Sequence, residues 1–171
     1  LEYAHIPNMN YLASNGITGL TNTVPAGMSP GSDTANLSIF GYDPVVSFTG
    51  RAPLEALSMD VNLGPDDAAF RCNIINAADN KMQDFTASHI DSMLSEIIIK
   101  QIGNYITDRD IEFYPGVSYR NLMVWRNYPY KNIAGTVPPH DIQDRNITEY
   151  LPSGEGSAEL IDLMSRAREI I

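Results

Sequence analysis

The sequence is poor in cysteine and in long apolar runs. Only one cysteine, Cys72, occurs in the 171 residues, so the chain can form no internal disulfide and no thiolate metal cluster. This usage fits a reducing compartment, and we expect a cytoplasmic protein in which Cys72 is a small buried hydrophobe. Apolar runs stop after a few residues, as at 97–99, far short of the roughly 20 residues that a membrane-spanning helix needs.

Basic residues are also scarce. Eleven Lys and Arg stand against 21 Asp and Glu, which gives a formal net charge of -10 and a pI near 4.5. This balance argues against a nucleic acid or an anionic membrane surface as the main partner. A small anionic ligand is compatible with it, because a few arginines in one cleft outweigh the average field locally.

The two ends of the chain are abrupt. The sequence has no initiator methionine and no basic segment leading into an apolar one, so it shows no signal peptide. It opens a few residues before a predicted helix and closes inside another. We therefore expect a piece of a longer protein, holding one domain or a domain with part of a second.

Hydrophobic spacing and turn residues predict helices that alternate with strands, so the expected fold class is α/β or mixed α+β. Helices are expected at 7–16, 33–40, 53–59, 90–106 and 157–171, and strands at 17–23, 68–75, 111–114 and 119–125. Within 90–106 the pattern predicts a buried face that includes Met93, Leu94 and Ile97, with Ser95 outward. Within 157–171 it predicts burial of Leu160, Leu163, Met164 and Ala167.

Ser32 stands where a Pro/Gly loop enters a predicted helix. Free backbone N–H groups and the positive end of the helix dipole stabilise an anion at such a point, and a serine there could accept a phosphoryl group. The alternative is structural: Ser32 is a plain N-cap, with Asp33 complementing the dipole.

Four arginines lie in glycine-rich or strand contexts: Arg51, Arg71, Arg120 and Arg126. Arg71 has apolar neighbours in a half-buried strand, and a guanidinium facing a cleft binds phosphate or carboxylate through two N–H groups. The alternative is that Arg71 lies at a solvated edge or pairs with Asp66 or Asp67.

His140 follows two prolines and precedes Asp141, so its imidazole is held stiffly and could shuttle a proton or anchor a ligand. An ordinary loop histidine is the alternative. His89, just before helix 90–106, could cap that helix or titrate. The three histidines lack zinc-site spacing, and no phosphate loop, G-x-G-x-x-G or G-x-S-x-G motif occurs.

Taken in order, these segments resemble the archaeal-type cofactor-independent phosphoglycerate mutases of the alkaline phosphatase superfamily. The matching motifs include Pro-Gly-Ser-Asp-Thr-Ala-Asn-Leu-Ser at 30–38, Thr-Gly-Arg-Ala-Pro-Leu-Glu-Ala at 49–56, Ala-Phe-Arg-Cys-Asn at 69–73, Phe-Tyr-Pro-Gly-Val-Ser-Tyr-Arg at 113–120 and Pro-Pro-His-Asp-Ile at 138–142. Residues 7–13, 23–25, 41–44 and 150–154 match as well. The opening residues 1–4 and the Ala-Pro-Leu-Glu-Ala form resemble a subgroup proposed to act as homoserine kinases.

The resemblance implies a reaction and a role for each matched residue. It implies conversion of 3-phosphoglycerate to 2-phosphoglycerate in glycolysis and gluconeogenesis, without 2,3-bisphosphoglycerate, assisted by two divalent metal ions such as manganese, zinc or magnesium. Ser32 matches the serine that is transiently phosphorylated and ligates a metal. Arg51, Arg71, Arg120 and His140 match positions expected to line the substrate cleft, so the expected partner is a small anionic phosphometabolite.

The chain also departs from the family pattern. The first metal motif, Asp-Gly-x-Gly-Asp-like, and the later aspartate and histidine ligands are not in it, and Asn10 and Ile6 replace an aspartate and a capping threonine. The resemblance implies that residues 1–46 form a strip of the phosphatase-like core and 47–171 the inserted substrate-binding domain. Alone, the chain is expected to be inactive. The alternatives are a homoserine kinase-like phosphotransferase and a non-catalytic module that binds phosphometabolites.

Overall fold

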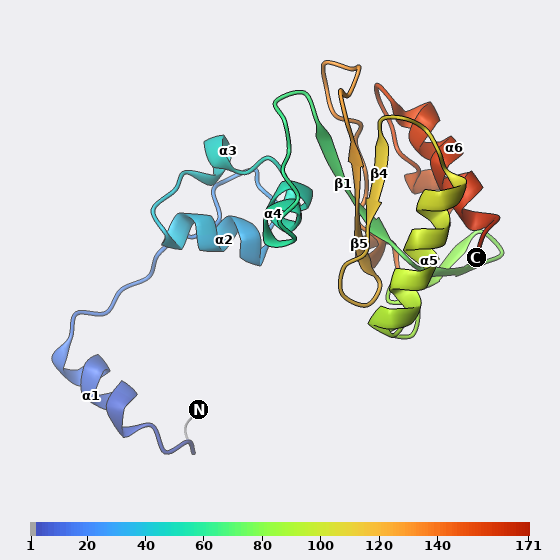
Figure 1. Ribbon diagram of the computed structural model, residues 1–171. Coiled ribbons are helices and arrows are strands. Elements are labelled where there is room, and N and C mark those ends of the chain that lie inside the picture. Colours follow the sequence, from blue (N-terminus) through green and yellow to red (C-terminus); the bar gives the residue numbers. More distant parts are fainter. Residues whose placement is uncertain (1–2) are drawn as a thin grey trace. The chain divides into compact units, whose positions relative to one another are not determined.

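The computed structural model describes residues 3–171 (Figure 1). The chain as a whole divides into two units, Leu1–Thr49 and Gly50–Ile171. Leu1 and Glu2, part of the predicted motif at 1–4, lie outside the described residues. The mixed helix-and-sheet class is confirmed. The identity predicted for the two parts, core strip and inserted domain, stays a prediction. No helix in the described part of the chain is both long and apolar enough to cross a bilayer.

The first unit contains three helices: α1 (Pro7–Asn15), α2 (Ser32–Ile39) and α3 (Pro44–Ser47). Helix α1 begins at a proline, whose missing N–H is not needed in the first turn, and ends at Gly16 as predicted. Helix α3 is capped by the Asp43 carboxylate, which accepts a hydrogen bond from the Val45 N–H at 3.0 Å. Helices α1 and α2 therefore lie within a residue or so of the predicted bounds.

The strand predicted at 17–23 is wrong. This segment is irregular, and Ile17 and Leu20 are fully exposed. A strand needs a neighbour that pairs with its N–H and C=O groups, and no described residue pairs with this segment. The weak alternation of apolar residues is a local tendency toward an extended conformation. It does not become a strand here, because no described residue pairs with the segment.

The second unit is built on an antiparallel sheet with strand order β1-β5-β4. Its strands are β1 (Ala68–Asn73), β4 (Ile111–Tyr114) and β5 (Arg120–Trp125), close to the three predicted strands. A hairpin of β2 (Asn76–Ala78) and β3 (Lys81–Asp84) was missed. Its turn residues Asp79 and Asn80 both have positive φ, and this Asp-Asn pair is the signal that could have revealed it.

Helices cover both faces of this sheet (Figure 1). Helices α5 (Ser92–Tyr105) and α6 (Ser157–Arg168) pack on one face, around buried residues such as Phe70, Ile99, Met123, Leu160 and Leu163. Helix α4 (Arg51–Ser58) packs on the other, where Ala52 and Ala56 contact Leu122 and Val124. Two short 3-10 helices, η1 (Pro139–Ile142) and η2 (Ile147–Tyr150), interrupt the long C-terminal loops.

The buried face of α5 differs from the predicted one. Ser95, Ile99 and Ile102 are buried, whereas Met93, Leu94 and Ile97 are exposed. Ser95 is inward because its hydroxyl donates to the side-chain oxygen of the buried Asn121 at 3.2 Å, which removes the cost of burying a lone hydroxyl.

In α6, Leu160 and Leu163 are buried as predicted, but Met164 is exposed. Cys72 is half-buried against the core on the α5 and α6 side, and burial raises the pKa of its thiol to about 11. The thiol therefore stays protonated at neutral pH and acts as the expected apolar packing group.

Candidate anion-binding site

Ser32 is the first residue of α2, and the N-cap position is held by Gly31. The alternative that Ser32 is a plain N-cap is therefore wrong. Ser32 is exposed, and its hydroxyl makes no hydrogen bond to another described residue. A hydroxyl in the first turn lies among backbone N–H groups that have no partner within the helix, which is where an attached phosphoryl group is stabilised.

Ser32 belongs to the first unit, whereas Arg51, Arg71, Arg120 and His140 all belong to the second. Three of these four are brought to one end of the three-stranded sheet. The register pairs Arg71 with Leu122 and Asn73 with Arg120. Because side chains alternate along a strand, both arginines share the sheet face that α4 partly covers, as diagonal neighbours.

Arg71 is held by an ion pair that the sequence did not reveal. Its Nε lies 2.9 Å from one carboxylate oxygen of Glu55, on α4, so the pairing with Asp66 or Asp67 is wrong. The side chain is half-buried, and its two Nη groups have no hydrogen-bond partner among the described residues. Glu55 therefore fixes the guanidinium from one edge and leaves the opposite edge for an anion.

Asn73 lies between the two arginines on the same face, next to Arg71 on β1 and opposite Arg120 on β5. Its side-chain oxygen is buried and has no hydrogen-bond partner in the described part of the chain. An acceptor left in this condition costs about 1–3 kcal/mol. Such unsatisfied polar atoms are rare in folded proteins and are typical of functional sites.

Arg120 and His140 are connected through two aromatic rings. The Arg120 guanidinium lies 5.0 Å from the Tyr119 ring centroid and donates to the Tyr119 hydroxyl at 3.0 Å. The Phe85 ring lies 6.2 Å from that of Tyr119 and 6.0 Å from the His140 imidazole. The His89 imidazole lies 6.5 Å from the Tyr119 ring. These five residues, Phe85, His89, Tyr119, Arg120 and His140, form the Tyr119 cluster.

His140 lies in η1, which Pro139 begins, so the stiff backbone expected from the two prolines is present. Its Nε2 is 3.5 Å from a carboxylate oxygen of Asp141, and the side chain is partly exposed. The imidazole is therefore presented at the surface against Phe85, where a ligand can reach it.

Arg51 begins α4, one turn before Glu55, and follows Gly50, which has φ of 124°. Positions i and i+4 of a helix share a face, so Arg51 lies on the side of α4 that carries the Arg71 ion pair. The structure thus gathers Arg71, Arg120 and His140 at one end of the sheet and places Arg51 on the helix face that meets Arg71.

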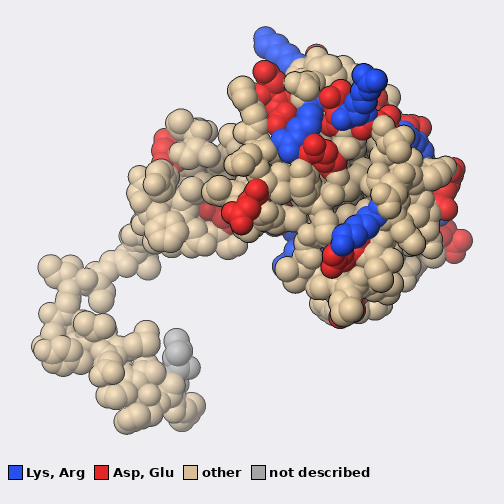
Figure 2. Space-filling model, in the orientation of Figure 1, with Lys and Arg blue, Asp and Glu red and all other residues tan. Residues whose placement is uncertain are grey.

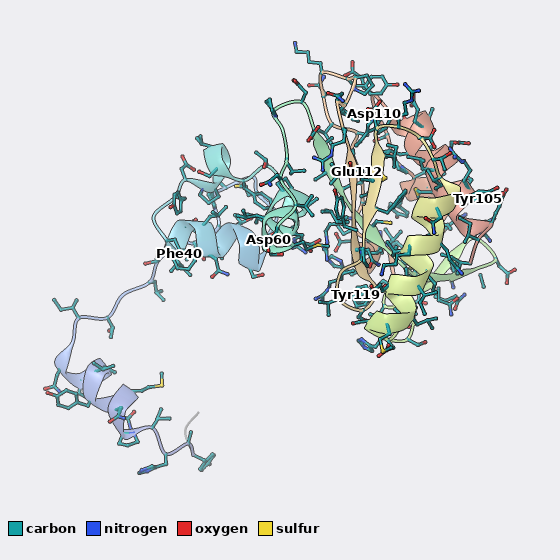
Figure 3. The ribbon with its side chains drawn as sticks, viewed as in Figure 1. Phe40, Asp60, Tyr105, Asp110, Glu112 and Tyr119 are labelled. Carbon is teal, nitrogen blue, oxygen red and sulfur yellow. The ribbon has the colours of Figure 1, made fainter. Side chains whose placement is uncertain are left out.

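Arg126, the fourth arginine noted in the sequence, is fully used by the fold. It pairs with Asp67 and with Glu112 at 2.7 Å each and donates to the backbone oxygen of Asn62 at 2.8 Å. The Gly64 N–H and then Arg126 hold the pKa of Asp67 below its usual range. Figure 3 shows Glu112 and Tyr119 toward opposite ends of the sheet, so this ion-pair network lies away from the Tyr119 cluster.

The second unit also has an open pocket of about 600 Å³, whose lining includes Asp108, Arg109, Asp110, Glu159, Asp162 and Arg166. Carboxylates outnumber arginines in it, and Arg166 is already paired with Asp108 at 2.9 Å. A phosphate would meet net repulsion there, so this pocket is the poorer candidate for an anion site.

A metal centre is not formed by residues 3–171. No three His, Cys, Asp or Glu residues in this range are placed together as a metal site. The predicted two-metal dependence, with Ser32 as one ligand, therefore stays a prediction.

Three contributors to the site were missed from the sequence: Glu55, Asn73 and Tyr119. Each stands inside a motif already quoted, beside or near a predicted arginine, at 49–56, 69–73 and 113–120. What the sequence could not show is that the β1/β5 register places Asn73 beside both arginines, and that α4 brings Glu55 to Arg71.

Comparisons with known proteins show the family to which the chain belongs. Residues 13–171 match the family model of 2,3-bisphosphoglycerate-independent phosphoglycerate mutase. The chain is 47% identical over its full length to a protein of Geobacter sulfurreducens named as a probable mutase of this kind, and 42% identical to one of Methanosarcina barkeri. It spans 43% of the length of each of these relatives.

A solved structure shows the same similarity. The cofactor-independent phosphoglycerate mutase from Thermoplasma acidophilum is 30% identical to the chain, with a TM-score of 0.57. The match covers 99% of this chain and 46% of that one. The structural match therefore extends over the same part of the sequence as the family model and the curated relatives.

Proposed function

Because the chain belongs to the family of 2,3-bisphosphoglycerate-independent phosphoglycerate mutases, we propose that it is part of an enzyme that interconverts 3-phosphoglycerate and 2-phosphoglycerate. The observation that carries this proposal is the gathering of Arg71, Arg120 and His140 at one end of the sheet. A small substrate with a phosphate and a carboxylate needs such a group of arginines and N–H donors, and the net charge of -10 then matters little.

Ser32 is the proposed nucleophile. Its oxygen attacks the phosphorus of 3-phosphoglycerate, the bond from phosphorus to the C3 oxygen breaks, and the serine proton ends on that oxygen. Phosphoserine and glycerate result, and the reverse steps return the phosphoryl group to the C2 oxygen. The first turn of α2 suits this role, because its backbone N–H groups favour the charge of the phosphoserine.

Divalent metal ions are part of the proposal, and when bound they would lower the pKa of the serine hydroxyl. The residues of the second unit supply binding and orientation. Arg71, fixed at its Nε by Glu55, offers its two Nη groups to one anionic group of the substrate. Arg120 and His140 bind the substrate at the Tyr119 cluster, and Arg51 extends the binding site along α4.

The proposal is tested in the intact protein that contains this chain. A coupled assay with 3-phosphoglycerate should show turnover in the presence of a divalent metal, and Ser32→Ala should abolish it while the circular dichroism spectrum stays unchanged. Appreciable mutase activity in Ser32→Ala would remove the phosphoserine role.

The two alternatives give different results. Phosphorylation of homoserine by ATP, with no mutase turnover, would make the parent a homoserine kinase-like phosphotransferase. Metal-independent binding of 3-phosphoglycerate that is lost in Arg71→Ala, with no turnover in the intact protein, would make it a binding module. Both outcomes keep the fold and the arginines and change only the chemistry at Ser32.

A further inference from the structure

We propose that His89 is a further substrate-binding residue, whose imidazole donates a hydrogen bond to the same anionic group that Arg120 binds. The proposal rests on the proposed function, because the ligand in question is phosphoglycerate. It is carried by the backbone around His89, by two hydrogen bonds that connect this backbone to the Tyr119–Arg120 segment, and by the exposure of the imidazole.

The backbone around His89 is strained. Ala87, Ser88 and His89 are consecutive and have φ of 48°, 57° and 53°. L-residues other than glycine enter this left-handed region at a cost of roughly 1–2 kcal/mol each and normally do so singly. A run of three is therefore expensive, and strain of this kind is concentrated at functional sites.

Asp84 holds this turn in place. Its carboxylate accepts hydrogen bonds from the N–H of Thr86 at 2.8 Å, the hydroxyl of Thr86 at 2.6 Å and the N–H of Ser88 at 2.6 Å. These bonds, first of all the one from the Thr86 hydroxyl, lower the pKa of Asp84 to about 2. Both carboxylate oxygens accept hydrogen bonds from the turn itself, and Asp84 attracts the His89 imidazole electrostatically without a salt bridge to it among the described residues.

Ser118 joins the strained turn to the arginine segment. Its hydroxyl donates to the backbone oxygen of Ile90 at 2.7 Å, and its N–H donates to the Ser92 hydroxyl at 3.0 Å. Ser118 also has a positive φ, of 55°, and is followed directly by Tyr119 and Arg120. His89 and Arg120 therefore belong to two segments that are held together just after His89, at Ile90 and Ser92.

The Tyr119 ring contacts both the His89 imidazole and the Arg120 guanidinium. The His89 ring meets the Tyr119 ring edge-on, at 65° and 6.5 Å, while the Arg120 guanidinium lies 5.0 Å from the same ring. His89 is exposed, and no hydrogen bond of its imidazole to another described residue is formed. An exposed imidazole without a hydrogen-bond partner, against the same tyrosine ring as an arginine, is suited to donate an N–H to a phosphate or carboxylate oxygen.

The test compares two substitutions of His89 in the 171-residue chain by calorimetric titration with 3-phosphoglycerate. His89→Phe keeps the edge contact with Tyr119 but has no N–H donor, and we expect its affinity to fall at least about tenfold, as for loss of one charge-assisted hydrogen bond. His89→Gln keeps a donor and should stay within about threefold of the unmodified chain.

Ser88→Gly is the matched control, because it relieves the left-handed strain and leaves the imidazole in place. It should raise the midpoint of thermal unfolding and leave the affinity unchanged. Circular dichroism of each variant checks that the fold is retained. Equal affinities of the unmodified chain and His89→Phe would overturn the proposal, and so would a loss in His89→Gln as large as in His89→Phe.

A parallel titration with inorganic phosphate separates this inference from the proposed function. If the intact protein has no mutase activity but His89→Phe still weakens phosphate binding, the proposed function fails and the role of His89 stands. If the unmodified chain binds neither 3-phosphoglycerate nor phosphate, the role of His89 is overturned, whatever the activity of the intact protein.

Discussion

The two units of the chain differ in charge and in burial. All eleven Lys and Arg residues belong to the second unit, beginning with Arg51, and those in the view of Figure 2 lie over that unit. In the first unit, by contrast, α1 buries no residue, and apolar side chains such as Leu12, Ile17 and Phe40 are exposed. The second unit has a sheet with a buried core on each face.

This difference shows that the local signals that place a helix are distinct from the packing that makes it stable. Proline, glycine and helical spacing place α1 and α2 correctly although little of either helix is buried, so these signals act locally. Isolated helices of this length are marginal in water, because most helical stability comes from tertiary packing. The second unit should therefore behave as the folded part of this chain.

The largest expected effect is in hydrogen exchange. Amides of β1 and β5 should exchange at least about 100-fold more slowly than those of α1 and of residues 17–23, because the strands open only when the second unit unfolds. Exchange followed by mass spectrometry of peptides measures this. Protection of α1 equal to that of β5 would show that the two units are equally stable and would break the comparison.

Leucine-to-alanine substitutions in the two units should differ in their effect on the free energy of unfolding. Leu122→Ala, at a fully buried position in the α4 core, should lower the free energy of unfolding by about 3–5 kcal/mol through lost burial and a new cavity. Leu12→Ala, in the exposed α1, should change it by less than about 0.5 kcal/mol. Chemical denaturation of both variants gives the values, and similar losses at the two sites would contradict the account.

The stability costs of glycine-to-alanine substitutions should differ less between the two units than those of the core substitutions. Gly156 has φ of 77°, and a Cβ there would lie 2.7 Å from the Tyr128 hydroxyl and 3.0 Å from the Tyr130 ring. Gly156→Ala should therefore cost about 2–4 kcal/mol, from strain and overpacking together. Gly27→Ala, in the first unit, has a φ of 86° but open space, so it should cost only about 1 kcal/mol. Equal costs in thermal melts would show that packing at Gly156 has no effect.

Loss of folding stability at acid pH should be specific to the second unit, and we expect it to be smaller than the effects of the substitutions above. The Gly64 N–H and then Arg126 lower the pKa of Asp67 in the folded state, and Arg126 and then Tyr114 lower that of Glu112. A carboxyl with a lowered pKa stabilises the fold at pH values above its unfolded pKa of about 4, and this contribution is lost as pH falls through the folded pKa. The denaturant concentration at the unfolding midpoint should therefore decrease as the pH is lowered below about 4. Arg126→Met should weaken this pH dependence. An unchanged pH dependence in this variant would contradict the assignment.

Much of the fold could be predicted from the sequence, and the failures have physical causes. Strands 111–114 and 119–125 were predicted because alternation and the Pro-Gly between them are local signals. The inward turn of Ser95 could not be predicted, because it depends on Asn121, 26 residues away. Residues 17–23 look like a strand only until pairing is considered.

The site was predicted in composition but not in its contacts. Arg71, Arg120 and His140 were identified through motifs, and the structure brings them to one end of the sheet. Their partners Glu55 and Phe85 come from α4 and from the loop after β3, so they follow from the packing of the chain, which no single motif reports. The same holds for His89, whose importance lies in a backbone conformation that the sequence does not display.

The most direct test of the central claim, that this end of the sheet binds phosphoglycerate, is calorimetric titration of the chain with 3-phosphoglycerate. Arg120→Met should weaken binding at least about tenfold, whereas Arg168→Met, which removes an exposed arginine at the end of α6, should leave the affinity unchanged. Equal affinities of the two variants, or no binding by the unmodified chain, would contradict the account.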